Sequence, residues 1–529
     1  MQATQISNHG FSHWCEHATI GCIFLIALFA PHSIAVTQGA WLLGMVFWLL
    51  RFAFYPRPRL FRSPVDYLLL GFFVLSGLSG VFSYSPIMSI GKMRAASLFT
   101  IVYLVAQNVR SLRLAHLLAL TLIGSCMLNV FWTAGQLIVG RGVKIESVQD
   151  TSPLAKAVFH TRTVRKPTPI VAGDTIWEVD GEPIGNPDQL AAALAQGSGS
   201  AKGSESAKGS ESARGSESAR GSESAKGSNT AKVRIYRVEW MPELEVPRGQ
   251  LLPGSTALDQ LGIAGWTRGR DWRATGFYGH WVTYAEVLQL IASLALGLFL
   301  ALPRKKSLLG LLLFVAIVGF VFALGMTVTR ASWIGFAVSV VGLLLMTASR
   351  RTLLIAGACA IPLVLGGLLL LQQKRNVGFI DAKDQSTSWR EMVWREGFQL
   401  LVSKPRHLLV GVGMDSIKGH WQEWGLFDQG RQPVGHMHSN VLQIALERGV
   451  PALIVWLLLL AVYARMLMRI IRASVDLPEA RGIALGAFGG LAGFFVSGLV
   501  HYNWGDSEVV TVLYFIMGLS LVTERILRR

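Results

Sequence analysis

The chain has 529 residues, of which 51% are hydrophobic and only 15% charged, and its mean hydropathy is +0.43. A soluble protein of this length carries far more charge, so the composition excludes an ordinary soluble enzyme and predicts an all-α polytopic membrane protein. The net charge of +17 would suit nucleic acid, but the basic residues lie in short connections between apolar segments, so we expect no nucleic-acid partner.

Apolar windows of about 17–25 residues predict about twelve transmembrane helices. Five lie in residues 1–140, four in 241–371 and three in 449–529, and polar segments at 141–240 and 372–448 separate the three groups. The predicted spans lie near residues 18–36, 39–55, 65–84, 95–109, 112–139, 276–302, 307–328, 331–348, 352–371, 449–471, 481–501 and 508–526.

Every second connection between these spans is basic. Examples are residues 57–62 after the second span, 304–306 after the sixth and 350–351 after the eighth. The positive-inside rule then predicts that both chain ends are cytoplasmic and that the two polar segments lie on the opposite side of the membrane. No cleavable signal peptide is evident, because the first apolar stretch lacks a basic flank.

Residues 141–240 are predicted to form a small α+β insert. We expect strands at 145–148, 176–179 and 231–238 and a helix at 188–194. This series resembles a bacterial PDZ domain, which implies docking of a periplasmic peptide or protein partner, whereas the alternative is a dispensable decoration. Inside the insert a six-residue repeat, Gly-Ser-Glu-Ser-Ala-Lys/Arg, runs from about 203 to 228 and predicts a disordered loop because it cannot bury a core.

The polar segment 372–448 contains a stretch, 387–404, that can form an amphipathic helix. Thr387 or Ser388 would be its N-cap, and Trp389 and Trp394 would anchor it at the membrane interface. Its apolar residues at helical spacing are Trp389, Met392, Val393, Leu400 and Leu401.

His438 is the strongest candidate for a catalytic group. It stands just before a predicted helix over 439–448, and the positive end of that helix disfavours the imidazolium form. A neutral imidazole can act as a general base, although an interfacial histidine that only hydrogen-bonds a loop is equally compatible with the pattern. His436 would be a spacer or a supporting residue.

Two arginines are candidates for binding a phosphate. Arg330 lies at the outer junction of two apolar helices, where a lone charge is costly, and Arg390 lies on the amphipathic helix. A guanidinium can bind phosphate oxygens through two hydrogen bonds, while the alternatives are a snorkelling side chain and a structural ion pair. The acidic residues show no metal-binding spacing, so we expect neither a metal ion nor a cofactor.

Three motifs, taken together, resemble the O-antigen ligase and polymerase superfamily. They are TVTRASW at 327–333, SWREMVWREGFQLLVSKPRHLLVGVGM at 388–414 and HMHSNVLQIALERGVPALI at 436–454. The resemblance covers roughly residues 276–505, and its strength comes from the order and the intervals of the motifs. The departures are His-Ser-Asn in place of the commoner His-Asn and the PDZ-like insert, which is not a general family feature.

Within the superfamily the chain is most similar to the O-antigen ligases. The resemblance implies a GT-C-like inner-membrane enzyme that joins O-antigen polysaccharide from undecaprenyl pyrophosphate to lipid A-core at the periplasmic face. It implies an inverting, metal-independent transfer with His438 as base and Arg330 and Arg390 on the pyrophosphate. Trp389 and Asn440 would support the site together with His436.

Three other functions are compatible with the sequence. An O-antigen polymerase would use the same donor with a second lipid-linked glycan as acceptor. A protein O-oligosaccharyltransferase would glycosylate Ser or Thr, and a PDZ-like domain would suit that role. A lipid or solute transporter is the alternative of a different class, but we find no repeat between the halves and transport would leave the polar motifs unexplained.

Overall fold

The computed structural model describes residues 2–54, 57–58, 60–160, 165–195, 229–237, 241–347, 349–375, 385–431 and 434–528. The chain divides into two compact units. The helical unit comprises Met1–Val130, Ala274–Leu368 and Phe379–Arg529, and the sheet unit comprises Phe131–Arg273 and Leu369–Gly378.

The α-helices before the first strand are α1 (Gln2–Phe29), α2 (Ile34–Leu50), α3 (Asp66–Val81), α4 (Pro86–Gly91), α5 (Met93–Ala96), α6 (Thr100–Asn108) and α7 (Leu112–Val139). Four long helices follow the sheet unit: α10 (Trp281–Ala301), α11 (Leu308–Met326), α12 (Arg330–Thr347) and α13 (Arg350–Arg375). The polar segment forms α14 (Gln385–Val402), α15 (Pro405–Val410), α16 (Ser416–His420), α17 (Leu426–Gly430) and α18 (Asn440–Arg448). The chain closes with α19 (Val450–Ala473), α20 (Pro478–Ser497) and α21 (Ser507–Leu527).

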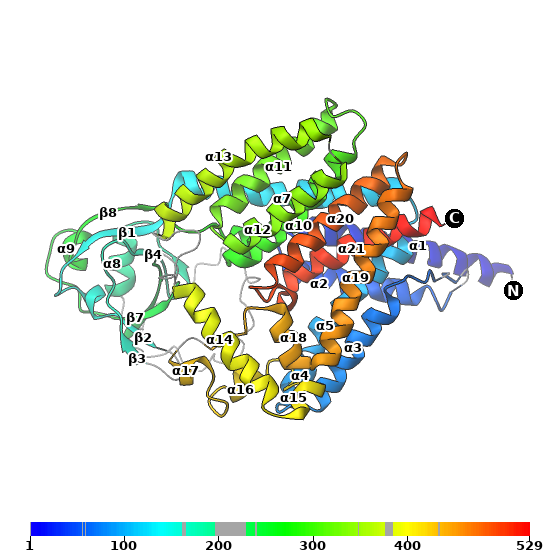
Figure 1. The fold of residues 1–529 in the computed structure, drawn as a ribbon. Helices are drawn as coiled ribbons and strands as arrows, with labels where there is room; N and C mark the ends of the chain where they lie inside the picture. Colours follow the sequence, from blue (N-terminus) through cyan, green and yellow to red (C-terminus); the bar gives the residue numbers. More distant parts are fainter. Residues whose placement is uncertain are drawn as a thin grey trace. The chain divides into compact units, whose positions relative to one another are not determined.

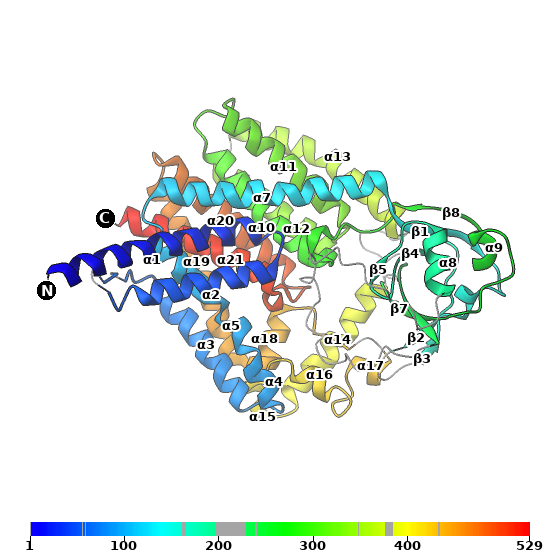
Figure 2. The same cartoon turned by 180° about the vertical axis from the view of Figure 1, so that it is seen from behind.

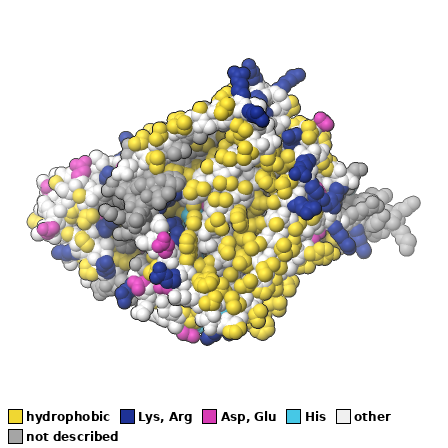
Figure 3. All heavy atoms as spheres, in the orientation of Figure 1, with side chains coloured by type: hydrophobic (Ala, Val, Ile, Leu, Met, Phe, Trp, Pro, Cys, Tyr) yellow, Lys and Arg dark blue, Asp and Glu magenta, His cyan; other side chains and the backbone are white. Residues whose placement is uncertain are grey.

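The helical unit has the character of a polytopic membrane protein. Among the described residues, nine helices are long and apolar enough to cross a bilayer, and α2 and α3 are shorter apolar helices. Large apolar side chains cover the outer surface, among them Leu308, Leu311 and Leu345, and Figure 3 shows how widely such side chains spread. Helices lie where all twelve spans were predicted, although the number of crossings stays a prediction.

The predicted start of the fourth span, residue 95, is wrong. The apolar helical stretch begins at Pro86 and reaches Asn108 through α4, α5, a short 3-10 turn and α6. Proline at the first helical position fits such a start, because its missing N–H would have no partner there.

Helices α10, α12 and α20 pack so closely that glycine is required where they meet. A Cβ on Gly297 of α10 would lie 2.1 Å from the backbone nitrogen of Gly486 in α20, and a Cβ on Gly335 of α12 would lie 2.7 Å from the carbonyl oxygen of Gly493. Small residues allow helix backbones to approach in this way inside membranes. These three helices therefore form a rigid centre for the unit.

The sheet unit contains one antiparallel sheet in the order β3-β2-β7-β6-β4-β1-β8, with β5 beside β4 (Figure 2). Its strands are β1 (Arg141–Val148), β2 (Val158–His160), β3 (Arg165–Pro167), β4 (Thr175–Val179), β5 (Glu182–Pro183), β6 (Thr230–Tyr236), β7 (Glu243–Pro247) and β8 (Ile263–Gly269). Helices α8 (Pro187–Ala195) and α9 (Ala257–Leu261) complete it. Alternate strand residues such as Val143, Ile176 and Val233 form the core.

The predicted strands and helix of the insert are present, but its predicted end at residue 240 is wrong. Strand β7 pairs with β6, and β8 pairs with β1 more than a hundred residues earlier. Such distant pairing has no local signature in the sequence. The six-residue repeat at 203–228 lies outside the described residues, and the likeness to a PDZ domain stays a prediction.

Substituting Gly486 with Ala should destabilise the helical unit. The added Cβ would lie 2.5 Å from Leu294 Cα, which is backbone and cannot move aside, so we expect a loss of about 1–3 kcal/mol. The thermal unfolding midpoint of the detergent-solubilised protein measures this. Gly342→Ala on α12 is the matched control, since its Cβ would meet nothing within 4 Å, and equal midpoints for the two variants would contradict the packing argument.

Candidate active site

Helices α14 and α18 bring the motifs of the polar segment together at one end of the helical unit, as both ribbon views show (Figures 1 and 2). Their contact is a small apolar core that includes Val393, Leu400, Leu401, Met437 and Leu446. The amphipathic helix was therefore correctly predicted. Its proposed N-cap was wrong, because α14 begins at Gln385, before Thr387 and Ser388.

The two tryptophans of α14 contact the histidine segment. The Trp389 ring lies edge-on to the His438 ring, with centroids 4.6 Å apart. The Trp394 indole N–H donates to the Met437 carbonyl at 2.8 Å. Both rings are half-buried, so part of each contacts the protein, and their anchoring at the membrane surface stays a prediction.

The backbone around His438 is held in an uncommon conformation. His438 has φ +46°, in the left-handed region that few residues other than glycine adopt. Ser439 caps α18 by accepting from the Leu442 N–H, and the Met437 N–H donates to Gln443 Oε1 at 2.6 Å. These contacts on both sides keep the histidine in its strained position, which is typical of functional sites.

The imidazoles of His436 and His438 lie against each other, with ring centroids 4.0 Å apart. The His438 backbone N–H donates to His436 Nδ1 at 3.1 Å, so that nitrogen carries no proton. Burial is the main reason why the pKa of both groups falls, to about 3 for His436. Electrostatic interaction with His436 and with the positive charge of Arg390 lowers the pKa of His438 further.

His438 is consequently a neutral imidazole at physiological pH, able to accept a proton. From the sequence we expected the positive end of α18 to keep His438 neutral, whereas burial is the larger cause of the lowered pKa in the structure. Arg390 lies near enough to His438 for its positive charge to lower the pKa of the imidazole.

The end of α18 is fixed by a buried carboxylate, Glu447. Its Oε1 accepts from the Gln443 side chain at 2.9 Å and from the Asp415 backbone N–H at 3.0 Å. Its Oε2 accepts from the Tyr502 hydroxyl at 3.2 Å and pairs with Arg448 at 3.3 Å. The glutamine and glutamate of the third motif therefore connect α18 to the loop after α15 and to the loop after α20.

Arg330 is the first residue of α12, at the turn after α11, as predicted. Val328 in this turn has φ +50°, a strained value for a β-branched residue, and Thr329 beside it is buried. One turn further in, the Ser332 hydroxyl donates to Glu286 Oε1 at 3.0 Å. A buried polar contact thus fixes the beginning of the helix that carries Arg330.

Glu286 of α10 was not singled out from the sequence. Its carboxylate is fully buried and also accepts from the Ser497 hydroxyl at 2.7 Å and the Asn503 amide at 3.0 Å, and His501 Nδ1 lies 3.0 Å away. The signal that could have revealed it is a lone acidic residue inside the apolar span 281–301.

Asn440 joins this cluster to α18. Its amide donates to Asn503 Oδ1 at 2.5 Å, its Oδ1 accepts from the Trp504 N–H at 3.0 Å, and its backbone N–H donates to the Gly498 carbonyl at 2.7 Å. Asn440 thus attaches α18 to the loop after α20, and its support of His438 stays a prediction. Ser332, two residues after Arg330, and Asn440, two residues after His438, therefore belong to one buried network.

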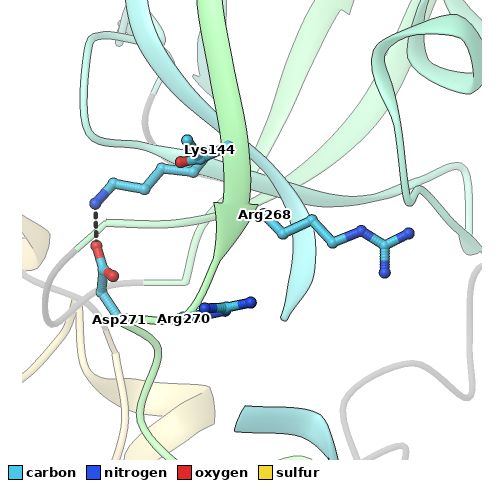
Figure 4. Close-up of a pocket in the computed structure, with 5 residues that line it drawn as sticks. Lys144, Arg268, Arg270 and Asp271 are labelled. Carbon is cyan, nitrogen blue, oxygen red and sulfur yellow. Dashed lines mark hydrogen bonds and ion pairs between the residues drawn. The ribbon is translucent and has the colours of Figure 1, made fainter. Parts of the chain in front are cut away.

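The sheet unit has a separate shallow cavity of about 390 Å³, lined by Lys144, Thr267, Arg268, Arg270 and Asp271 (Figure 4). Lys144 and Asp271 form an ion pair across it. It contains none of the predicted site residues. In the described part of the chain, no group of three or more His, Cys, Asp or Glu side chains is arranged to hold a metal ion.

Acid should destabilise the fold through His436 and His438. Their pKa values lie below the ordinary 6.5, so below that pH the unfolded chain binds more protons and the free energy of unfolding falls as the pH drops from about 6.5 toward 4. We expect the thermal midpoint of the variant with both His436→Gln and His438→Gln to fall less steeply over this range. His17→Gln, at an exposed histidine, should keep the wild-type slope, and identical slopes for all three proteins would contradict the burial argument.

Comparison with known proteins adds an independent finding. Residues 315–457 match the protein family described as O-Antigen ligase, and this range includes Arg330, Arg390 and His438. A search of curated proteins finds no match. The chain therefore contains, at residues 315–457, a domain that is similar to the O-antigen ligase family.

Proposed function

We propose that this protein is an O-antigen ligase of the bacterial inner membrane, which transfers O-antigen polysaccharide from undecaprenyl pyrophosphate to lipid A-core at the periplasmic face. The observation that carries the proposal is His438, a half-buried neutral imidazole within the electrostatic reach of Arg390, in a domain similar to the O-antigen ligase family. A neutral base and a neighbouring guanidinium are the two groups that glycosyl transfer from a pyrophosphate requires.

In the proposed reaction, His438 removes the proton from a hydroxyl of the acceptor sugar. The oxygen attacks the anomeric carbon of the lipid-linked glycan and forms the new glycosidic bond with inversion. The bond from the anomeric carbon to the pyrophosphate oxygen breaks, and the lipid pyrophosphate leaves with the electron pair. The proton remains on His438 until solvent removes it.

Arg330 and Arg390 stabilise the leaving group. Negative charge grows on the pyrophosphate as the bond breaks, and a guanidinium can donate two parallel hydrogen bonds to phosphate oxygens. Arg390 also favours the neutral form of His438, because its positive charge lowers the pKa of the imidazole. The same arginine thus keeps the imidazole unprotonated before the reaction and stabilises the leaving group during it.

The acceptor distinguishes this proposal from the related reactions. A polymerase would add the glycan to a second lipid-linked glycan, and a protein glycosyltransferase would add it to Ser or Thr. The separately folded sheet unit would suit a protein acceptor, so this alternative belongs in the test.

Purified protein given lipid-linked O-antigen should glycosylate lipid A-core and neither of the other acceptors. His438→Ala should slow the transfer by about 10²–10⁴-fold, the usual contribution of a general base, while binding of undecaprenyl pyrophosphate persists. Gel and mass-spectrometric analysis of the three acceptors measures the outcome, with His17→Ala as the control. Modification of another acceptor, or full activity of His438→Ala, would refute the assignment.

Removing either phosphate-binding arginine should weaken both donor binding and transfer. Loss of charged hydrogen bonds worth about 1.5–3 kcal/mol lowers kcat/KM by about 10–100-fold for Arg330→Ala and Arg390→Ala. Lysine at either position should restore only part of the activity, because it lacks the planar guanidinium. Arg395→Ala, at an exposed arginine on α14, is the control, and an equal loss there would show a general charge effect.

A further inference from the structure

We propose that Glu286 is a positioning residue that fixes the separation between Arg330 and His438. This inference rests on the proposed function of those two residues. Glu286 itself lies outside the matched range 315–457, so it belongs to a part of the chain to which the family match assigns no role.

The Glu286 carboxylate gathers polar groups from separate parts of the chain. Ser332 comes from α12, Ser497 from the end of α20, and His501 and Asn503 from the loop that follows. All are at most 5% exposed, and Glu286 is fully buried. A carboxylate has about four acceptor positions, so this arrangement uses its full hydrogen-bonding capacity.

A continuous path of three hydrogen bonds runs through Glu286 from α12 to α18. Ser332, two residues after Arg330, donates to Glu286 at 3.0 Å, and Asn503 donates to the same carboxylate at 3.0 Å. Asn440, two residues after His438, donates to Asn503 at 2.5 Å. Each end of the path thus lies two residues from a group that takes part in the proposed chemistry.

The path is stiff because breaking any of its hydrogen bonds leaves a buried polar group without a partner, which is costly in free energy. A buried polar group that loses its partner keeps the desolvation cost without the compensating bond. The carboxylate accepts on both oxygens, and an amide in its place would present an N–H₂ toward at least one donor. Glu286 therefore holds the starts of α12 and α18 at a fixed distance from each other. Glutamine, which has a similar size, cannot accept the same set of hydrogen bonds.

Two histidines near this network influence the proposed base electrostatically. His501, which lies on Glu286, and His280, which precedes the first residue of α10, both act on the pKa of His438. The network is thus close to His438, and Glu286 reaches Asn440 of α18 through Asn503. It positions the site without contacting substrate.

The test compares kcat with donor binding in Glu286→Gln and in a pair of serine variants. We expect kcat of Glu286→Gln to fall by about 10–100-fold, because small misplacements of reacting groups have costs of that order. Binding of undecaprenyl pyrophosphate alone should change less than about threefold, since each arginine can still bind it. Ser332→Ala should show the same kcat defect in weaker form, and Ser332→Thr should regain activity because it keeps the hydroxyl.

Ser339→Ala is the matched control. Ser339 is a fully buried serine on the same helix, but it bonds Gln289 and the Gly489 carbonyl rather than Glu286. Loss of kcat in Ser339→Ala equal to that in Ser332→Ala would overturn the proposal, as would a Glu286→Gln enzyme with wild-type kcat. If Glu286→Gln does not fold, the comparison of Ala and Thr at position 332 decides.

A measurement that does not depend on transfer separates this proposal from the proposed function. Spin labels at positions 334 on α12 and 441 on α18 should give a narrow distance distribution in the wild type and in Ser339→Ala, and a broader one in Ser332→Ala. An unchanged distribution in Ser332→Ala overturns the positioning role. A broadened distribution in a protein that transfers no glycan supports the positioning role and refutes the ligase instead.

Discussion

The helical unit depends on one constraint, which is that a carboxylate buried among apolar helices must be surrounded by hydrogen-bond donors. Glu286 satisfies this constraint with donors from α12, α20 and the loop after α20. Because these donors come from distant parts of the chain, satisfying the carboxylate also brings the ends of several helices together. The close packing of α10 against α20 at glycine contacts gives the network a rigid support.

Glu447 repeats the same arrangement at the other end of α18. It is almost fully buried, and it accepts from a side chain on its own helix, from a backbone N–H of the preceding loop and from Tyr502. The short helix after His438 is thus held at its start through Asn440 and near its end through Glu447. A helix of nine residues would be marginal alone, so these buried contacts account for its stability.

The sequence was sufficient for features that depend on local patterns. Apolar runs predicted the long helices, the amphipathic spacing predicted α14, and the motif around His438 predicted the start of α18. It was insufficient where the partners are distant: β8 closes the sheet against β1, and the partners of Glu286 lie up to 217 residues away. The contacts of the α14 tryptophans could not be predicted for the same reason, since Trp394 bonds a carbonyl 43 residues further along the chain.

The position of Glu286 has a consequence for how the protein is made. Helix α10 enters the membrane before Ser332, Ser497 and Asn503 have been synthesised, so its carboxylate is inserted without any of them. A charged residue in a membrane helix costs up to about 3 kcal/mol at insertion, and the apolar residues of the same helix must offset it. The carboxylate gains its full set of donors only after α20 and the following loop have been synthesised, so the helical unit cannot reach its final packing before then.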